Sequence, residues 1–134
     1  MNKMPVEIVT PERKVYENEV NMIIARGGDG DLGIMAGHVP VVTTLKVSQL
    51  RLKTDQGDQV IAVSGGFLEV KPDKVTVLAE AAELPEEIDV DRAARAKERA
   101  ERRLSEKGND NLDTARAEMA LHRAINRIAT AKAR

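Results

Sequence analysis

The arginines between Ile88 and Arg103 are the residues of this chain whose type and spacing could do chemistry. The segment reads IDVDRAARAKERAERR, and Arg92 and Arg99 fall on one face if it is helical. A guanidinium is permanently charged and donates paired hydrogen bonds that suit phosphate and carboxylate. The segment is therefore either a binding surface for an anion or a solvated helix face on which Asp89 caps the N-terminus.

A second set of arginines lies near the C-terminus, at Arg116, Arg123, Arg127 and Arg134. Their spacing places them in a strip about 40° wide on an α-helix. An apolar stripe adjoins this strip and consists of Ala117, Leu121, Ala124, Ile125 and Ile128. The arginines could border a buried seam and extend into water. However, like charges in this register disfavour the helix and no acidic residue is interleaved with them, which favours a partner outside the helix.

Arrangements typical of catalysis are missing from the sequence. A zinc site needs three or four converging ligands, and the two histidines, His38 and His122, fall in different halves of the chain. The stretch GGDGDLG from Gly27 lacks the Lys-Ser/Thr of a phosphate-binding loop. Ser64 does not sit in a G-x-S-x-G frame. The sequence therefore predicts a protein that is not an enzyme and that binds no metal ion.

Composition excludes further classes of function. The 134 residues carry a formal net charge of −1, with no Cys, one Tyr and one Phe. Single-stranded nucleic acid needs aromatic stacking platforms that this chain does not have. There is neither an apolar run long enough to span a bilayer nor an apolar signal core at the N-terminus. We expect a soluble, globular protein that does not span a membrane.

The secondary-structure elements that must position these arginines fall in two parts of the chain, which differ in hydrophobic periodicity. From Met4 to about Ala79 the chain alternates in short β-branched runs separated by turns, which is typical of an antiparallel sandwich or barrel. A slip in the alternation between Val47 and Leu50 indicates a bend or bulge.

After Pro85 the pattern becomes helical. A first helix is expected from Ile88 to Leu104, and a second begins at Asn111 or Asp113 and runs to the C-terminus. The short connection predicts an antiparallel hairpin. Its contact surfaces are rich in alanine, so the hairpin should be marginal by itself and able to leave its docked position.

Three stretches, GDGDLGIMAGHVPVV from Gly28, SGGFLEV from Ser64 and VTVLAEAAE from Val75, resemble the epsilon subunits of bacterial F-type ATP synthases. The resemblance is collinear over essentially the whole chain. It implies a β-sandwich of about ten strands at residues 1–84 and a regulatory two-helix hairpin at residues 85–134. It also implies a non-catalytic subunit of the central stalk, peripheral to the cytoplasmic face of the cell membrane, in a synthase that translocates protons or other ions.

The resemblance also implies partners for the sandwich and the hairpin. The loop that faces the c-ring in this family matches Gly30, Asp31 and Leu32 here, and His38 follows in a stretch near the gamma subunit. The hairpin can extend along gamma, a form associated with inhibition of ATP hydrolysis. In that form the strip of Arg116, Arg123, Arg127 and Arg134 would meet acidic loops of the catalytic beta subunits, which alternate with alpha.

Some bacterial relatives bind ATP while the hairpin is folded on the sandwich, and they carry an Ile/Leu-Asp-x-x-Arg-Ala motif that this chain matches from Ile88 to Ala93. The ATP site implied by the resemblance consists of Glu83, Ile88, Asp89, Arg92, Ala93, Arg99, Arg123 and Arg127. Its arginines would surround the triphosphate, with or without Mg²⁺. Its two carboxylates would take adenine or ribose donors, or Asp89 would hold Arg92. Two alternatives stay open: the arginines pair with Glu98 and Glu101, or the protein is a structural rotor clamp that binds no nucleotide.

Overall fold

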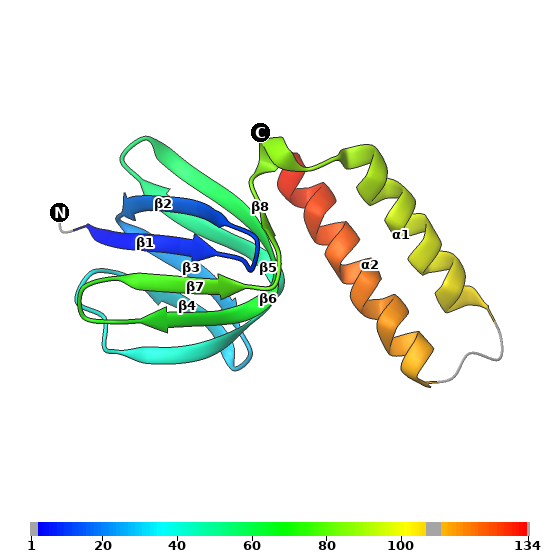
Figure 1. Cartoon of the computed structure of the whole chain (residues 1–134), viewed down its shortest axis with the longest axis horizontal. Coiled ribbons are helices and arrows are strands. Elements are labelled where there is room, and N and C mark those ends of the chain that lie inside the picture. Colours follow the sequence, from blue (N-terminus) through cyan, green and yellow to red (C-terminus); the bar gives the residue numbers. More distant parts are fainter. Residues whose placement is uncertain (1–2, 107–110, 134) are drawn as a thin grey trace.

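The computed structural model describes residues 3–106 and 111–133 and has a β-sandwich followed by a helical hairpin (Figure 1). The strands are β1 (Met4–Val9), β2 (Lys14–Val20), β3 (Met22–Gly27), β4 (Gly30–Ile34), β5 (Val41–Thr54), β6 (Gly57–Val70), β7 (Val75–Ala79) and β8 (Ala82–Glu83). A 3₁₀ turn, η1 (Pro85–Glu87), leads into the helices α1 (Val90–Ser105) and α2 (Asn111–Ala131). The predicted order of a β part and an α part is confirmed.

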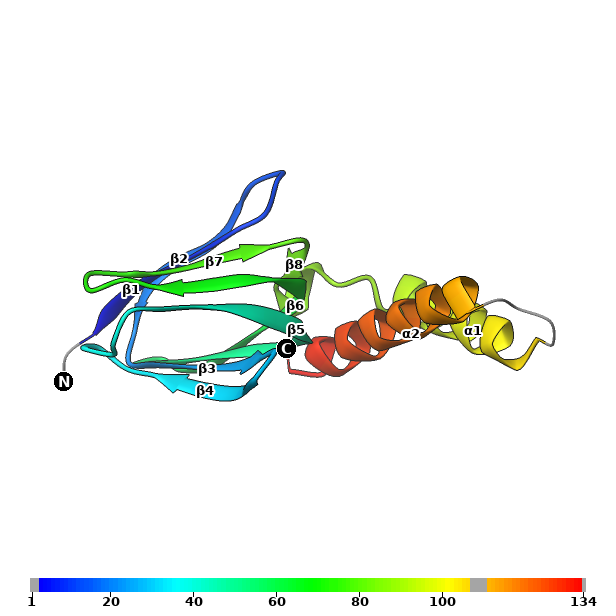
Figure 2. The same cartoon turned by 90° about the horizontal axis from the view of Figure 1, so that it is seen from below.

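The strands pair in the order β2-β1-β7-β6-β5-β3-β4, with β8 on β6. Two layers result, with β1 and β7 in one and β3 and β4 in the other (Figure 2). All neighbours are antiparallel except β1 and β7, which are parallel. The expectation of a purely antiparallel sandwich was wrong for this pair. Strand β1, at the start of the chain, pairs with β7, which begins 66 residues after β1 ends.

The described part of the chain contains eight strands rather than ten. The difference arises in β5 and β6, which are 14 residues each and pair in one constant register from Val41↔Val70 to Thr54↔Gly57. Each therefore runs as one long strand where shorter pieces were expected. The predicted irregularity is present in the pairing of β5 with β3, whose register shifts between Ile24 and Gly27.

The core of the sandwich is formed by the inward residues of alternating strands. In β7, for example, Val75, Val77 and Ala79 are buried and Leu78 is exposed. The stretch GGDGDLG contains the two-residue turn between β3 and β4, where Gly30 adopts a φ of 128° that favours glycine. This stretch is therefore a β-hairpin turn and not a phosphate-binding loop.

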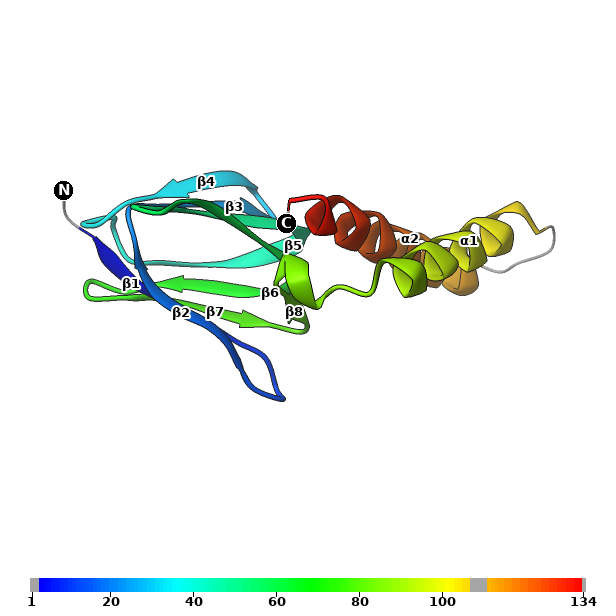
Figure 3. The same cartoon turned by 90° about the horizontal axis from the view of Figure 1, so that it is seen from above.

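The hairpin projects from one end of the sandwich, where α1 begins and α2 ends (Figure 3). The carboxylate of Asp89 caps α1 by accepting the backbone N–H of Arg92 at 3.0 Å, so α1 begins one residue later. Buried side chains on the helices are mainly alanines, namely Ala93, Ala100, Ala117, Ala124 and Ala131. The prediction of a small, alanine-rich helix contact is confirmed.

Two side chains of α2 join the hairpin to the sandwich by hydrogen bonds. The Nδ2 of Asn126 donates to the carbonyl oxygen of Ser48 at 2.8 Å. The Nε2 of Gln49 donates to the Oγ1 of the fully buried Thr130 at 3.2 Å. A small apolar cluster of Ala62, Ile88 and Ala131 completes this contact. Little apolar area is buried here, so the hairpin is held by a few specific bonds.

Candidate anion site at the base of the hairpin

The site begins with an ion pair between Glu83, the last residue of β8, and Arg127 of α2. The Arg127 Nε lies 2.6 Å from Glu83 Oε1, and its Nη2 lies 3.0 Å from Oε2. The two side chains are 22% and 29% exposed, which leaves them partly screened from water. This two-point geometry fixes the guanidinium at the junction of sandwich and hairpin.

The matched motif lies beside this pair because the linker runs past the end of α2. Ile88 is 3% exposed and packs with Ala131, one turn after Arg127. Asp89 follows as the N-cap, and Ala93 is fully buried at the first turn of α1. The side chain of Arg92 is exposed to solvent. The motif residues therefore lie near Glu83 and Arg127 because the linker and the hairpin are folded against each other.

A groove between α1 and α2 holds the next arginines. It has a volume of about 680 Å³ and is lined by Ala96, Arg99, Ala100, Arg103, Ala115, Arg116, Ala117, Met119, Ala120 and Arg123. Among the described residues, its lining contains four arginines and no Asp or Glu. Arg99 and Arg123, predicted from different helices, are thus brought to one cavity. The arrangement can attract an anion with several negative charges.

The structure separates the arginines of the predicted strip on α2. Arg116 and Arg123 line the groove, whereas Arg127 pairs with Glu83. No acid is interleaved with the strip on α2 itself, and the partner of Arg127 comes from outside the helix, from a strand 44 residues earlier. Arg134 lies outside the described residues.

The alternative pairing with local glutamates is not seen for the two motif-side arginines. Among the described residues no ion pair joins Arg92 or Arg99 to Glu98 or Glu101. Both arginines are exposed on α1. Their positive charge is therefore available to a ligand, although the geometry alone does not name one.

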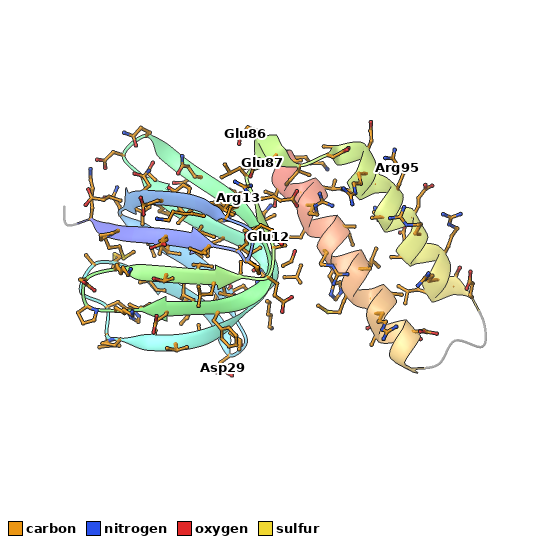
Figure 4. The ribbon with its side chains drawn as sticks, viewed as in Figure 1. Glu12, Arg13, Asp29, Glu86, Glu87 and Arg95 are labelled. Carbon is orange, nitrogen blue, oxygen red and sulfur yellow. The ribbon has the colours of Figure 1, made fainter. Side chains whose placement is uncertain are left out.

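Sequence reasoning missed a contact that ties the linker to the sandwich. The Nη2 of Arg13, in the turn between β1 and β2, lies 2.6 Å from Glu87 Oε2 in η1 (Figure 4). The other oxygen of Glu87 accepts the backbone N–H of Leu84 at 2.9 Å. A glutamate three residues after a turn start is a capping-box signal that could have been noticed. Its pairing with Arg13, 74 residues away, had no local signal.

The predicted partner surfaces of the sandwich lie at opposite ends of β4. Gly30, Asp31 and Leu32 begin this strand next to the hairpin, and Asp31 lies 3.4 Å from Arg26. His38 lies past the other end of β4, in a turn where its backbone N–H donates to the Met35 carbonyl oxygen at 3.1 Å. The structure therefore does not unite these residues into one surface.

Exposed apolar residues mark another surface of the sandwich. Phe67 is 52% and Leu78 51% exposed, and the two are direct neighbours across β6 and β7. Val42 of the adjoining β5 is also exposed. A patch of this kind is typical of a contact with another protein.

Other classes of site are not found in the described part of the chain. No group of three or more His, Asp or Glu residues there is arranged to hold a metal ion. None of the helices described is long and apolar enough to cross a membrane.

Two family models match the chain and together span nearly all of it. Residues 3–85 match the β-sandwich domain of the ATP synthase delta/epsilon chain, and residues 86–132 match its long α-helix domain. The chain is 52% identical over 128 residues to an ATP synthase epsilon chain of Halalkalibacterium halodurans. The aligned region covers 96% of each sequence. It is 59% identical over 108 residues to that of Brevibacillus brevis, covering 80% of this chain and 82% of the relative.

Solved structures show the same fold. A chain in the cryo-EM structure of the Euglena gracilis mitochondrial ATP synthase, which includes OSCP, F1 and the c-ring, superposes with a TM-score of 0.79 at 25% identity. The match covers 95% of this chain and 80% of that one. A chain of the Tetrahymena thermophila mitochondrial ATP synthase central stalk and c-ring has a TM-score of 0.62 at 15% identity, covering 97% of each, and supports the fold alone.

Proposed function

The chain belongs to the epsilon chains of ATP synthase, components of the central stalk, and from this premise we propose that its hairpin binds ATP when it is folded on the sandwich. Bound ATP would hold the hairpin down, and its release would let the hairpin extend and inhibit ATP hydrolysis. The protein itself would be non-catalytic and peripheral to the cytoplasmic face of the cell membrane.

One observation carries this proposal: the folded chain assembles Glu83, Ile88, Asp89 and Arg127 from three different segments at the base of the hairpin. Each segment alone presents an incomplete set of contacts. A ligand that needs all of them binds the folded hairpin and not the extended one. Such a ligand shifts the equilibrium toward the folded form.

The chemistry of the residues suits a nucleoside triphosphate. Arg99 and Arg123 face one groove and would bind phosphate oxygens from two sides, with Arg92 on the same face of α1 as Arg99. Asp89 and Glu83 would accept hydrogen bonds from adenine or ribose. Because Glu83 already binds Arg127, the ligand has to compete with this ion pair or share it.

Thermodynamic linkage between ligand binding and hairpin docking gives the size of the stabilisation. A ligand present at a hundredfold excess over its Kd, and bound only to the folded hairpin, stabilises that form by roughly 2.7 kcal/mol. This is comparable with the few bonds that join α2 to the sandwich, each worth about 1 kcal/mol. The cellular ATP level could therefore decide where the hairpin lies.

The proposed regulation follows because the ATP site and the surface for the beta subunits share residues. Arg123 and Arg127 serve the proposed ATP site, and they also belong, with Arg116 and Arg134, to the arginines that are expected from the sequence to meet acidic loops of the beta subunits. One set of arginines cannot bind both partners at once. ATP on the folded hairpin would thereby withhold the cations that inhibition needs.

The sandwich supplies the contacts of the stalk in this proposal. The exposed apolar patch of Val42, Phe67 and Leu78 is suited to the gamma subunit, since contact would remove it from water. Gly30, Asp31 and Leu32 would face the c-ring, and His38 would approach gamma. An ion pair through Asp31 would add only about 0–1 kcal/mol, so it would orient the contact more than strengthen it.

Calorimetric titration with ATP tests the site, with and without Mg²⁺. We expect heat of binding in the wild-type chain and its loss in an Asp89→Ala, Arg92→Ala variant. An Asp91→Ala, Arg95→Ala variant is the matched control, because it removes the same charges from exposed positions of α1. Absence of binding in the wild type would leave the alternative of a structural rotor clamp. Equal losses of ATP affinity in both variants would show that Asp89 and Arg92 do not form the binding site.

A further inference from the structure

The linker that leads from β8 to α1 is attached to the sandwich along its first residues. Leu84 packs on the sandwich core, and Pro85 is buried. The backbone N–H of Glu87 donates to the carbonyl oxygen of Leu84 at 3.0 Å, which closes η1. The direction in which the chain leaves the sandwich is therefore set by the orientation of this short turn.

Glu87 uses its two carboxylate oxygens for two different contacts. Its Oε1 accepts the backbone N–H of Leu84 at 2.9 Å, and its Oε2 accepts the Nη2 of Arg13 at 2.6 Å. The first contact stays within the linker, whereas the second joins the linker to the turn between β1 and β2. Glu87 thus connects the structure of η1 to a fixed point on the sandwich.

The turn that carries Arg13 is itself held by Thr10. Thr10 is only 8% exposed, and its backbone N–H donates to the Arg13 carbonyl oxygen at 2.9 Å. Its Oγ1 accepts the Arg13 backbone N–H at 3.4 Å. The turn stands out from the two layers at the end of the sandwich where the hairpin begins (Figures 2 and 3). Arg13 therefore reaches the linker from a turn whose backbone is anchored in the sandwich.

After Glu87 the chain has two extended residues before the first helix. Ile88 has a φ of −79° and a ψ of 124°, and Asp89 has a φ of −82° and a ψ of 100°. The Ile88 side chain is buried with Ala62 of β6 and Ala131 at the end of α2. A change in the direction of η1 would move Ile88 out of this contact, because the residue follows directly after the turn.

We propose that Arg13 is a positioning residue for the docked hairpin. Through its ion pair with Glu87, here called the latch, it orients η1 so that Ile88 enters its contact with Ala131. Without the latch the linker samples more directions, and docking the hairpin then costs more conformational entropy. The inference goes beyond the proposed function, because neither a nucleotide nor an arginine of the hairpin takes part in it.

An ordinary surface ion pair is the competing interpretation of this contact. The side chains of Arg13 and Glu87 are 50% and 34% exposed, and exposed pairs contribute little to stability. However, this pair joins segments 74 residues apart, and the same carboxylate also holds Leu84. We therefore expect its effect on hairpin docking, by about two- to fivefold in the opening equilibrium, and not on the core of the sandwich.

The test measures amide hydrogen exchange of the full chain without nucleotide. We expect Arg13→Gln to speed exchange in α1 and α2 by about two- to fivefold, while the core amides of β5 and β6 keep their rates. Glu87→Gln should have the same effect, because its amide oxygen still caps η1 but carries no charge for Arg13. Arg13→Lys, which keeps the charge, should restore most of the protection. Added salt should reduce the difference between wild type and Arg13→Gln, since the pair is exposed.

Glu86→Gln is the matched control, because Glu86 is the exposed neighbour of Glu87 and carries the same charge (Figure 4). In the double variant Arg13→Gln, Glu87→Gln the two effects should not add, since either change alone opens the latch. Additive effects, an equal acceleration by Glu86→Gln, or unchanged exchange in both single variants would overturn the proposal. A lack of ATP binding in the calorimetric titration would refute only the proposed function, because this exchange is measured without nucleotide.

Discussion

At the scale of single residues, the Glu83–Arg127 pair joins the two parts of the chain. It is bidentate and only partly exposed, so solvent screens it less than a surface pair. It also occupies two side chains that the proposed ligand needs. The same contact therefore favours the folded hairpin and competes with ATP.

We expect Arg127→Ala to lower the free energy of unfolding by about 1–2 kcal/mol, because it leaves the Glu83 carboxylate half-buried without its partner. Urea unfolding of Arg127→Ala, Glu83→Gln and the double variant gives the coupling between the two sites. A coupling of zero would show that the pair contributes nothing to docking.

Asp55 gives a prediction about pH. It accepts a hydrogen bond from Asn21 Nδ2 at 3.0 Å and pairs with Lys3. These contacts, the Asn21 bond first, hold the pKa of Asp55 below its usual 3.8. Because the folded pKa is depressed, the stabilisation is present above that usual value and is lost as pH falls through the lower folded value.

An Asp55→Asn variant should therefore be less stable than the wild type at neutral pH. The difference should shrink in acid, below the usual carboxyl pKa. Thermal unfolding of both proteins across this range measures it. A difference that stays constant with pH would mean that the carboxylate charge is not what stabilises the fold.

At the scale of elements, the pairing of the long strand β6 with β7 depends on one close backbone approach. Gly66 in β6 has a φ of 130°, and a Cβ there would lie 2.1 Å from the carbonyl oxygen of Leu78. Only glycine lets β6 pass β7 at this distance. Gly57 has a φ of 115°, but a Cβ there would meet nothing within 4 Å.

We expect Gly66→Ala to cost about 3 kcal/mol or more, since it adds backbone displacement to strain. Gly57→Ala, the matched control, carries the strain alone and should cost about 1–2 kcal/mol. Chemical denaturation of both variants measures the two costs. Equal costs would show that the approach of β6 to β7 relaxes easily.

The elements also show what sequence reasoning can and cannot reach. Local signals predicted a first helix from Ile88, close to its observed start at Val90, and the alanine-rich hairpin, because each depends on residues near one another in the chain. The parallel pairing of β1 with β7 and the ion pair of Arg127 with Glu83 join distant segments. No local pattern encodes such a choice of partner.

The same distinction between local signals and contacts of distant segments holds for the candidate site. Motif and spacing identified Asp89, Arg92, Arg99 and Arg123, and the structure places Arg99 and Arg123 at one groove. Arg103 lies outside the Ile88–Ala93 motif, and it also lines that groove. Its role depends on how closely α1 and α2 approach, which is set by alanine packing and not by any spacing of charges.

At the scale of the whole molecule, a stable sandwich carries a weakly held hairpin. The sandwich has a continuous core that includes the fully buried Ile8, Ile23 and Leu52. Among the described residues, the linker and hairpin are joined to it by a few hydrogen bonds, two ion pairs and a small apolar cluster. In the proposed function, this imbalance would let the sandwich remain folded in the stalk while the hairpin changes position.

Amide hydrogen exchange of the wild-type chain, with and without ATP at a hundredfold excess over Kd, tests this account most directly. We predict that ATP slows exchange in α1 and α2 by up to about a hundredfold, while the core amides of β5 and β6 are unchanged. Exchange in the helices that is already as slow as in the core without ATP, or that ATP does not alter, would contradict a hairpin held in place by the nucleotide.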